Sequence, residues 1–89
     1  VRSSMTPSVL ILRMRHVPAI DATGMFLLES FVLKAKKRGT TVILSELSRL
    51  PKAFIKKMGF YNIVGKENIM DNFDDALVRA NKVRVLKNA

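Results

Sequence analysis

The chain has 89 residues, which is enough for one small domain and too few for two. Hydrophobic residues make up 48% and charged residues 26%, as in globular proteins, and no apolar run approaches the ~20 residues of a membrane-spanning helix. The lack of cysteine excludes disulfides and thiolate metal sites, and with no signal-peptide pattern we expect a cytoplasmic setting. A formal net charge of +9 favours anionic partners.

The first predicted element is a buried strand from Val9 to Met14, because Val9 to Leu12 form a continuous apolar run. A polar turn follows, and Asp21 stands where a helix should begin. A helix N-terminus presents unpaired backbone N–H groups and the positive end of the helix dipole. We therefore predict a binding loop for a phosphate, a nucleotide or an acidic partner, made of Asp21, Ala22, Thr23 and Gly24.

The longest predicted helix runs from Ala22 to Arg38 and ends at Gly39. The apolar spacing assigns it a sheet-facing side made of Gly24, Leu27, Leu28, Phe31 and Ala35. Phe26 and Leu33 are seven residues apart and point away from that side, so another part of the domain covers them or they are offered to a partner. The candidate contact face consists of Met25, Phe26, Glu29 and Leu33.

A second buried strand is predicted over Thr40 to Ser45, which is rich in β-branched residues. A strand, a helix and a strand in this order form a βαβ unit with parallel strands and a right-handed crossover. The remaining predicted elements are a short helix from Pro51 to about Met58 that stops at Gly59, a turn over 60–65, a short edge strand over 68–70, and a last helix capped by Asp71. The core stripe of this last helix is assigned to Phe73, Ala76, Leu77, Ala80 and Val83.

The sequence offers no convincing set of catalytic groups, so we predict no catalytic residue, no metal ligand and no cofactor. His16 is the only histidine and has no cysteine or second histidine beside it. Glycine-rich phosphate loops and dinucleotide fingerprints are absent. The aromatic residues fall mainly at core spacings, so nucleic-acid binding rests on the basic charge alone.

The order of several short motifs resembles the STAS domain, the module shared by sulfate transporters and anti-sigma factor antagonists. The resemblance extends over nearly the whole chain from about Ser8. The residues that carry it are Val17, Pro18, Ile20, Asp21, Thr23, Gly24, Leu28, Glu29, Lys37, Gly39, 42–45, 57–60, Asn68, Ile69 and 75–77.

The resemblance implies an α/β fold with parallel central strands backed by helices, which does no chemistry and works through protein contacts. In the antagonist branch, the residue directly after the motif Asp is a serine or threonine that a kinase phosphorylates. That position here is Ala22, so a phosphorylation switch would need Thr23, whose hydroxyl could instead bond locally to the backbone. Together with the basic charge, this departure resembles the other branch, the cytoplasmic C-terminal domain of SulP-type anion transporters.

We therefore expect one STAS-like domain over residues 1–89 with a non-enzymatic regulatory role at the cytoplasmic face of the membrane. The expected partners are the membrane part of its own transporter, an acidic cytosolic protein such as acyl carrier protein, anionic lipid headgroups, or a second copy in a homodimer. Complete STAS domains carry strands ahead of the first strand seen here, so we expect a piece that lacks them. The alternatives are a stand-alone antagonist of the anti-sigma type and a basic nucleic-acid-binding module.

Overall fold

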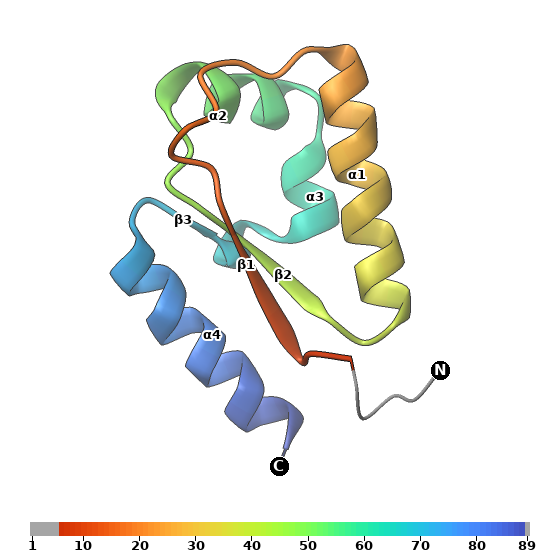
Figure 1. Ribbon diagram of the computed structural model, residues 1–89, viewed down its shortest axis with the longest axis vertical. Coiled ribbons are helices and arrows are strands. Elements are labelled where there is room, and N and C mark those ends of the chain that lie inside the picture. Colours follow the sequence, from red (N-terminus) through yellow and green to blue (C-terminus); the bar gives the residue numbers. More distant parts are fainter. Residues whose placement is uncertain (1–5, 89) are drawn as a thin grey trace.

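The elements follow one another as the apolar pattern predicts, with a strand, a long helix and a second strand first (Figure 1). The computed structural model describes residues 6–88. Within them lie β1 (Val9–Arg13), α1 (Ala22–Lys37), β2 (Thr41–Ser45), α2 (Arg49–Lys57), α3 (Phe60–Val64), the 3-10 turn η2 (Lys66–Asn68), β3 (Ile69–Met70) and α4 (Phe73–Lys87). None of the helices in this described part is long and apolar enough to cross a membrane.

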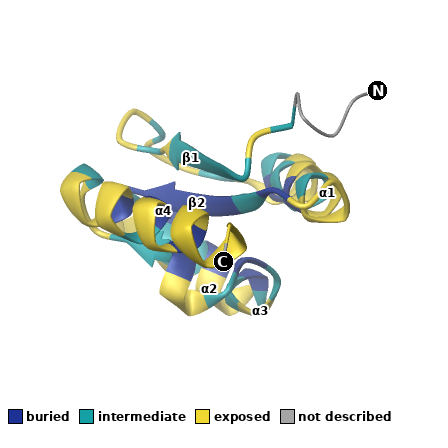
Figure 2. Ribbon diagram, turned by 90° about the horizontal axis from the view of Figure 1, so that it is seen from below, coloured by how far each residue is buried: buried dark blue, intermediate teal, exposed yellow. Residues whose placement is uncertain are grey.

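The strands pair in the order β1-β2-β3, and all of them are parallel. Pairing of β1 with β2 runs from Val9 opposite Thr41 to Arg13 opposite Ser45, which confirms the predicted βαβ unit. Since β2 is central, its residues from Val42 to Ser45 are buried, whereas β1 is half-buried (Figure 2). Of the two strands predicted to be buried, β2 is buried except at Thr41, and β1 is not.

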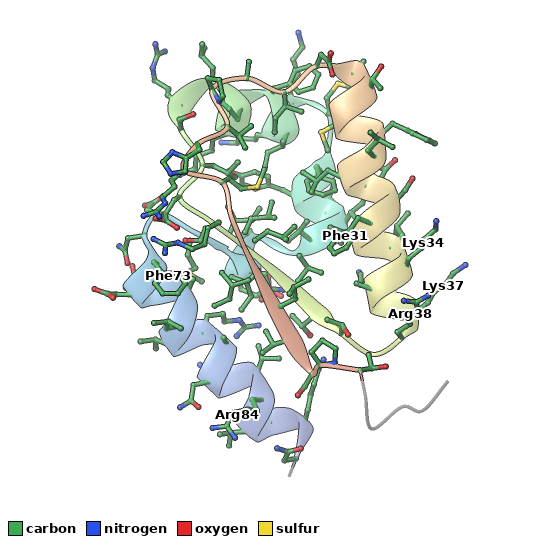
Figure 3. The ribbon with its side chains drawn as sticks, viewed as in Figure 1. Phe31, Lys34, Lys37, Arg38, Phe73 and Arg84 are labelled. Atoms are coloured by element: carbon green, nitrogen blue, oxygen red, sulfur yellow. The ribbon has the colours of Figure 1, made fainter. Side chains whose placement is uncertain are left out.

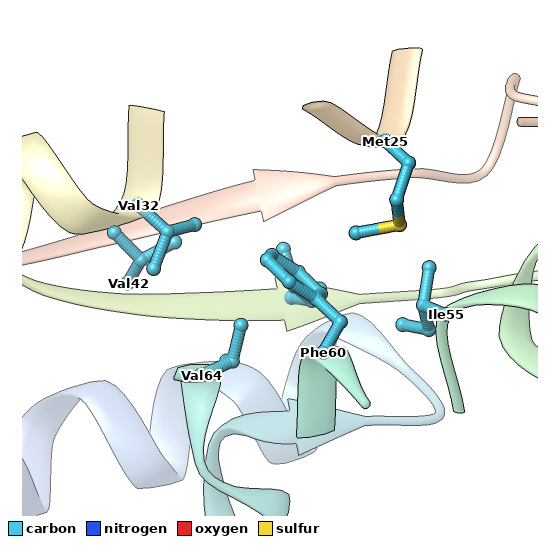
Figure 4. Close-up of a cluster of buried hydrophobic side chains, with 7 residues drawn as sticks. Met25, Val32, Val42, Ile55, Phe60 and Val64 are labelled. Atoms are coloured by element: carbon cyan, nitrogen blue, oxygen red, sulfur yellow. The ribbon is translucent and has the colours of Figure 1, made fainter. Parts of the chain in front are cut away.

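Side chains alternate between the two faces of the sheet, and each face has its own helical cover. Val42 and Leu44 point to the side of α1, α2 and α3, where they join a cluster completed by Met25, Val32, Ile55, Phe60 and Val64 (Figure 4). Ile43 points to the other side, where Ala76 and Ala80 of α4 cover it. The domain therefore has one thin apolar layer on each side of β2.

The outer edge of β1 is open. Thr41 N–H donates to the Ser8 carbonyl, and Met14 N–H donates to the Ser45 carbonyl. Because hydrogen-bonding direction alternates along a strand, Val9, Ile11 and Arg13 turn their backbone groups away from β2. Within residues 6–88 no strand pairs with that edge.

The predicted core side of α1 is wrong in part. Met25 and Val32 are the buried residues of this helix, with exposures of 6% and 1%, whereas Leu27 and Phe31 are 62% and 43% exposed. The reason is that α1 packs on β2 and α3, so its flank toward β1 faces the open edge. Leu28 and Ala35 lie on both the predicted and the observed side. Met25 consequently cannot belong to an exposed contact face.

The last helix also differs from the prediction at its start. Its N-cap is Asn72, whose Oδ1 accepts the Asp75 N–H at 2.8 Å, and not Asp71, which pairs instead with Lys52 at 2.8 Å. Leu77 is 47% exposed, because Ala76, Ala80 and Val83 form the stripe that faces the sheet.

The second helix starts at Arg49, two residues before Pro51, and the predicted turn over 60–65 contains the short helix α3. Gly39 and Gly59 follow helix ends with φ of 82° and 78°, as helix-terminating glycines do. These two predicted helix stops are confirmed.

Candidate functional site

The Asp21 loop lies at the carboxyl end of β1, where the chain turns into α1. Asp21 has an extended backbone, and its Oδ1 accepts the Gly24 N–H at 2.8 Å. A Cβ on Gly24 would lie 3.3 Å from that same Oδ1, so glycine leaves room for the cap. The prediction that Asp21 begins the helix is confirmed, and Asp21 and Gly24 together fix the shape of the loop.

An apolar hollow of about 550 Å³ opens beside this loop. It is lined by Met14, Val17, Ala19, Ile20, Asp21, Gly24, Leu27 and Leu28. Asp21 is the only charged lining residue, and one N–H of the first turn is already used by its carboxylate. The lining therefore suits an apolar side chain better than a phosphate, and the predicted phosphate or nucleotide role of the loop stays a prediction.

The predicted contact residues of α1 separate into two groups. Phe26 and Leu33 are 64% and 45% exposed, and Glu29 lies between them on the same face at helical spacing. Met25 points inward toward Phe60 and Ile55 (Figure 4). The face that a partner could reach is thus Phe26, Glu29 and Leu33, which we call the outer face of α1.

Ala22 and Thr23 occupy the first turn of α1, and both are exposed. The Thr23 hydroxyl is therefore accessible to a kinase, whereas Ala22 has no oxygen that could be phosphorylated. Both lie beside the Asp21 cap, and Ala22, four residues before Phe26, lies on the same side of the helix as the outer face of α1.

Sequence reasoning missed a polar cluster at the carboxyl ends of the strands. Arg13 donates from Nε and Nη2 to Glu46 Oε2 and Oε1 at 2.7 and 2.8 Å, and its guanidinium lies 4.0 Å from the centroid of the Phe73 ring. Ser45 Oγ donates to the same carboxylate at 2.9 Å. The Arg13 hydrogen bonds, with help from Ser45, lower the pKa of Glu46 to about 2.

The backbone of Glu46 shows why this cluster is structural. Glu46 has a φ of 66°, a left-handed conformation that is uncommon for residues other than glycine, and its N–H donates to the Met70 carbonyl at 3.0 Å. The ion pair therefore ties the ends of β1 and β2 to the start of α4. The parallel pairing of Arg13 with Ser45 was the signal that could have revealed it, because it places Glu46 next to Arg13.

The described residues, 6–88, contain no group of three or more histidine, cysteine, aspartate or glutamate side chains that could hold a metal ion. His16 is exposed on the loop before Asp21 and helps to line a second hollow of about 530 Å³ with Arg15, Pro18, Arg49 and Leu50 among its neighbours. Nothing in this arrangement resembles a nucleophile with its base.

A family model described as the STAS domain matches residues 2–76. The chain belongs to the STAS domain family. A comparison with curated proteins gives no match.

Two solved structures support the family at the level of the fold. A sulfate transporter family protein from Wolinella succinogenes shares 42% identity with a TM-score of 0.86, over 91% of this chain and 66% of that one. The SulP transporter STAS domain from Vibrio cholerae shares 29% identity with a TM-score of 0.80, over 93% of this chain and 63% of that one. This STAS chain thus spans about two thirds of these relatives, and the predicted α/β STAS fold is confirmed.

Proposed function

We propose that the chain is a non-enzymatic regulatory and protein-interaction domain of a SulP-type sulfate or other inorganic anion transporter, at the cytoplasmic face of the membrane. The observation that carries this proposal is the 42% identity over 91% of the chain to a sulfate transporter family protein. The Vibrio cholerae SulP transporter STAS domain supports it independently.

The shape of the site fits binding rather than catalysis. The apolar hollow beside the Asp21 loop is suited to an apolar side chain, and the outer face of α1 adds two exposed apolar residues around Glu29. Such a surface gains energy when a partner removes it from water. We assign it to contact with the membrane part of the same transporter or with a cytosolic regulatory protein.

The first test is the size and location of the gene product, measured by immunoblot of soluble and membrane fractions with an antibody against this domain. The proposal expects a large band that stays in the membrane fraction after carbonate extraction. A small soluble band would refute it and would favour a stand-alone regulator of the antagonist type. Incubation with the cognate kinase and mass spectrometry at Thr23 would then examine that alternative.

A second test addresses the outer face of α1 in the gene product. Phe26→Ser with Leu33→Ser should reduce sulfate uptake several-fold without changing the amount of protein in the membrane. The matched control is Val78→Ser with Val85→Ser on α4, which has the same spacing and exposures of 70% and 54%. Equal loss in both double variants would show that general surface polarity, and not the α1 face, controls uptake.

A further inference from the structure

The amino end of the sheet brings the last turns of α1 and α4 together. Lys87 Nζ donates to the carbonyls of Ser8, just before β1, and Gly39, just after α1. Both helices therefore finish at the end of the domain opposite the Asp21 loop (Figure 1).

The segments that form this amino end carry basic side chains and no acidic ones. The seven aspartate and glutamate residues of the chain lie at positions 21, 29, 46, 67, 71, 74 and 75. Residues 30–45 and 76–88 therefore contain none. Besides Lys36 and Lys87, the exposed basic residues toward the ends of the two helices are Lys34, Lys37, Arg38, Lys82 and Arg84. Figure 3 labels all of these five except Lys82. We call these five residues the amino-end patch.

The lysines that bind backbone carbonyls at this end of the domain are not those of the patch. Lys36 and Lys87 already bind backbone carbonyls of Ile63, Ser8 and Gly39. In residues 6–88 the two ion pairs, Arg13–Glu46 and Lys52–Asp71, leave the patch without a carboxylate partner. A helix C-terminus carries only about half a negative charge, so the helix dipoles do not neutralise the patch.

Apolar side chains lie among these cations. Phe31 and Leu86 are 43% and 63% exposed. Phe31 lines a hollow of about 380 Å³ with Leu10 and Ala35, and Lys34 and Arg38 stand in the same lining. Cations mixed with exposed phenylalanine and leucine are typical of surfaces that enter the headgroup layer of a membrane.

We propose that the amino-end patch docks on an anionic lipid surface, with its cations on the headgroup phosphates and Phe31 at the level of the headgroups. This inference deepens the proposed function and rests on it, since a transporter domain works beside a leaflet. A membrane fits better than nucleic acid, because the aromatic ring of Phe31 lines a hollow with aliphatic neighbours and is not part of a row of stacking platforms.

The test measures flotation of the 89-residue chain with vesicles of phosphatidylcholine alone and with 30 mol% phosphatidylglycerol added. The wild type should bind the anionic vesicles only, and less at higher salt. Lys34→Gln, Lys37→Gln and Arg38→Gln together should lower binding by more than ~10-fold, because each cation near an anionic surface contributes a factor of about five.

The matched control removes the same charges from α2, at the carboxyl end. Arg49→Gln, Lys56→Gln and Lys57→Gln also exchange one arginine and two lysines, all of them exposed, and should retain binding within about two-fold. Circular dichroism would establish that both variants are folded. Equal loss in the two triple variants, or tighter binding of the wild type to a DNA duplex than to vesicles, would overturn the proposal.

A fluorescent reporter tests the orientation, because the chain contains no tryptophan. Phe31→Trp should show a blue-shifted emission on anionic vesicles, whereas Phe26→Trp should not. A blue shift at position 26 alone would overturn the assignment to the amino end. A small soluble gene product that binds vesicles would refute only the transporter function, and a membrane-integral product whose domain ignores vesicles would refute only this inference.

Discussion

Truncation of two adjacent residues of α1 distinguishes the observed core side from the predicted one. Met25 is 6% exposed and packs in the cluster with Phe60, so Met25→Ala should cost about 3 kcal/mol, within the ~2–5 kcal/mol range of such truncations. Phe26 is 64% exposed, and its smaller loss of burial is offset by the better helix propensity of alanine, so Phe26→Ala should stay within about 1 kcal/mol.

Thermal and urea unfolding followed by circular dichroism measure both effects. A chain of 89 residues has a total stability of roughly 4–13 kcal/mol, so Met25→Ala removes a large share of it. At about 4–8 °C per kcal/mol, its Tm should fall by roughly 12–24 °C, against a few degrees for Phe26→Ala. A larger fall for Phe26→Ala than for Met25→Ala would refute the placement of α1 on β2 and α3.

Substitutions at three further positions examine polar features of the fold. Asn68→Ala should cost about 1–3 kcal/mol in urea unfolding, because buried Asn68 donates to the Val64 carbonyl at 2.9 Å and accepts from Arg79 Nε at 2.9 Å. Asp21→Ala should cost about 0.5–2 kcal/mol by loss of the cap, whereas Asp21→Asn should retain most of it. Because the folded pKa of Glu46 is about 2 against 4.5 in the unfolded chain, its ion pair stabilises the fold fully above pH 4.5 and less as the pH falls toward 2. The difference in urea midpoint between wild type and Glu46→Gln should therefore shrink over that pH range, and a constant difference would contradict the ion-pair account.

Local sequence signals predicted the order of the main elements, because each signal depends on only a few neighbouring residues. These signals are the apolar run of β2, the Asp21 cap, and the glycines after α1 and α2. They can be recognised in the sequence without knowledge of the tertiary structure. Parallel pairing followed from the length of the helix between β1 and β2.

The buried side of α1 could not be predicted from the sequence alone. This helix has apolar residues around most of its circumference, including Met25, Phe26, Leu27 and Leu28, so periodicity permits more than one core side. The choice depends on where α3 packs, and α3 was expected to be only a turn. The ion pair of Arg13 with Glu46 likewise depends on strand register, which joins residues 33 positions apart.

The Asp21 loop and the α1 residues of the amino-end patch lie at opposite ends of one helix. α1 begins at the Asp21 cap and ends beside Lys37, and its 16 residues span about 24 Å. That length is about three times the ~8 Å Debye length at physiological salt, so charge removed from the amino-end patch changes the potential at the Asp21 loop very little. Lipid binding and binding at the Asp21 loop can therefore be altered separately, and a patch variant that also weakened binding at the loop would act through movement of α1 rather than through its charge.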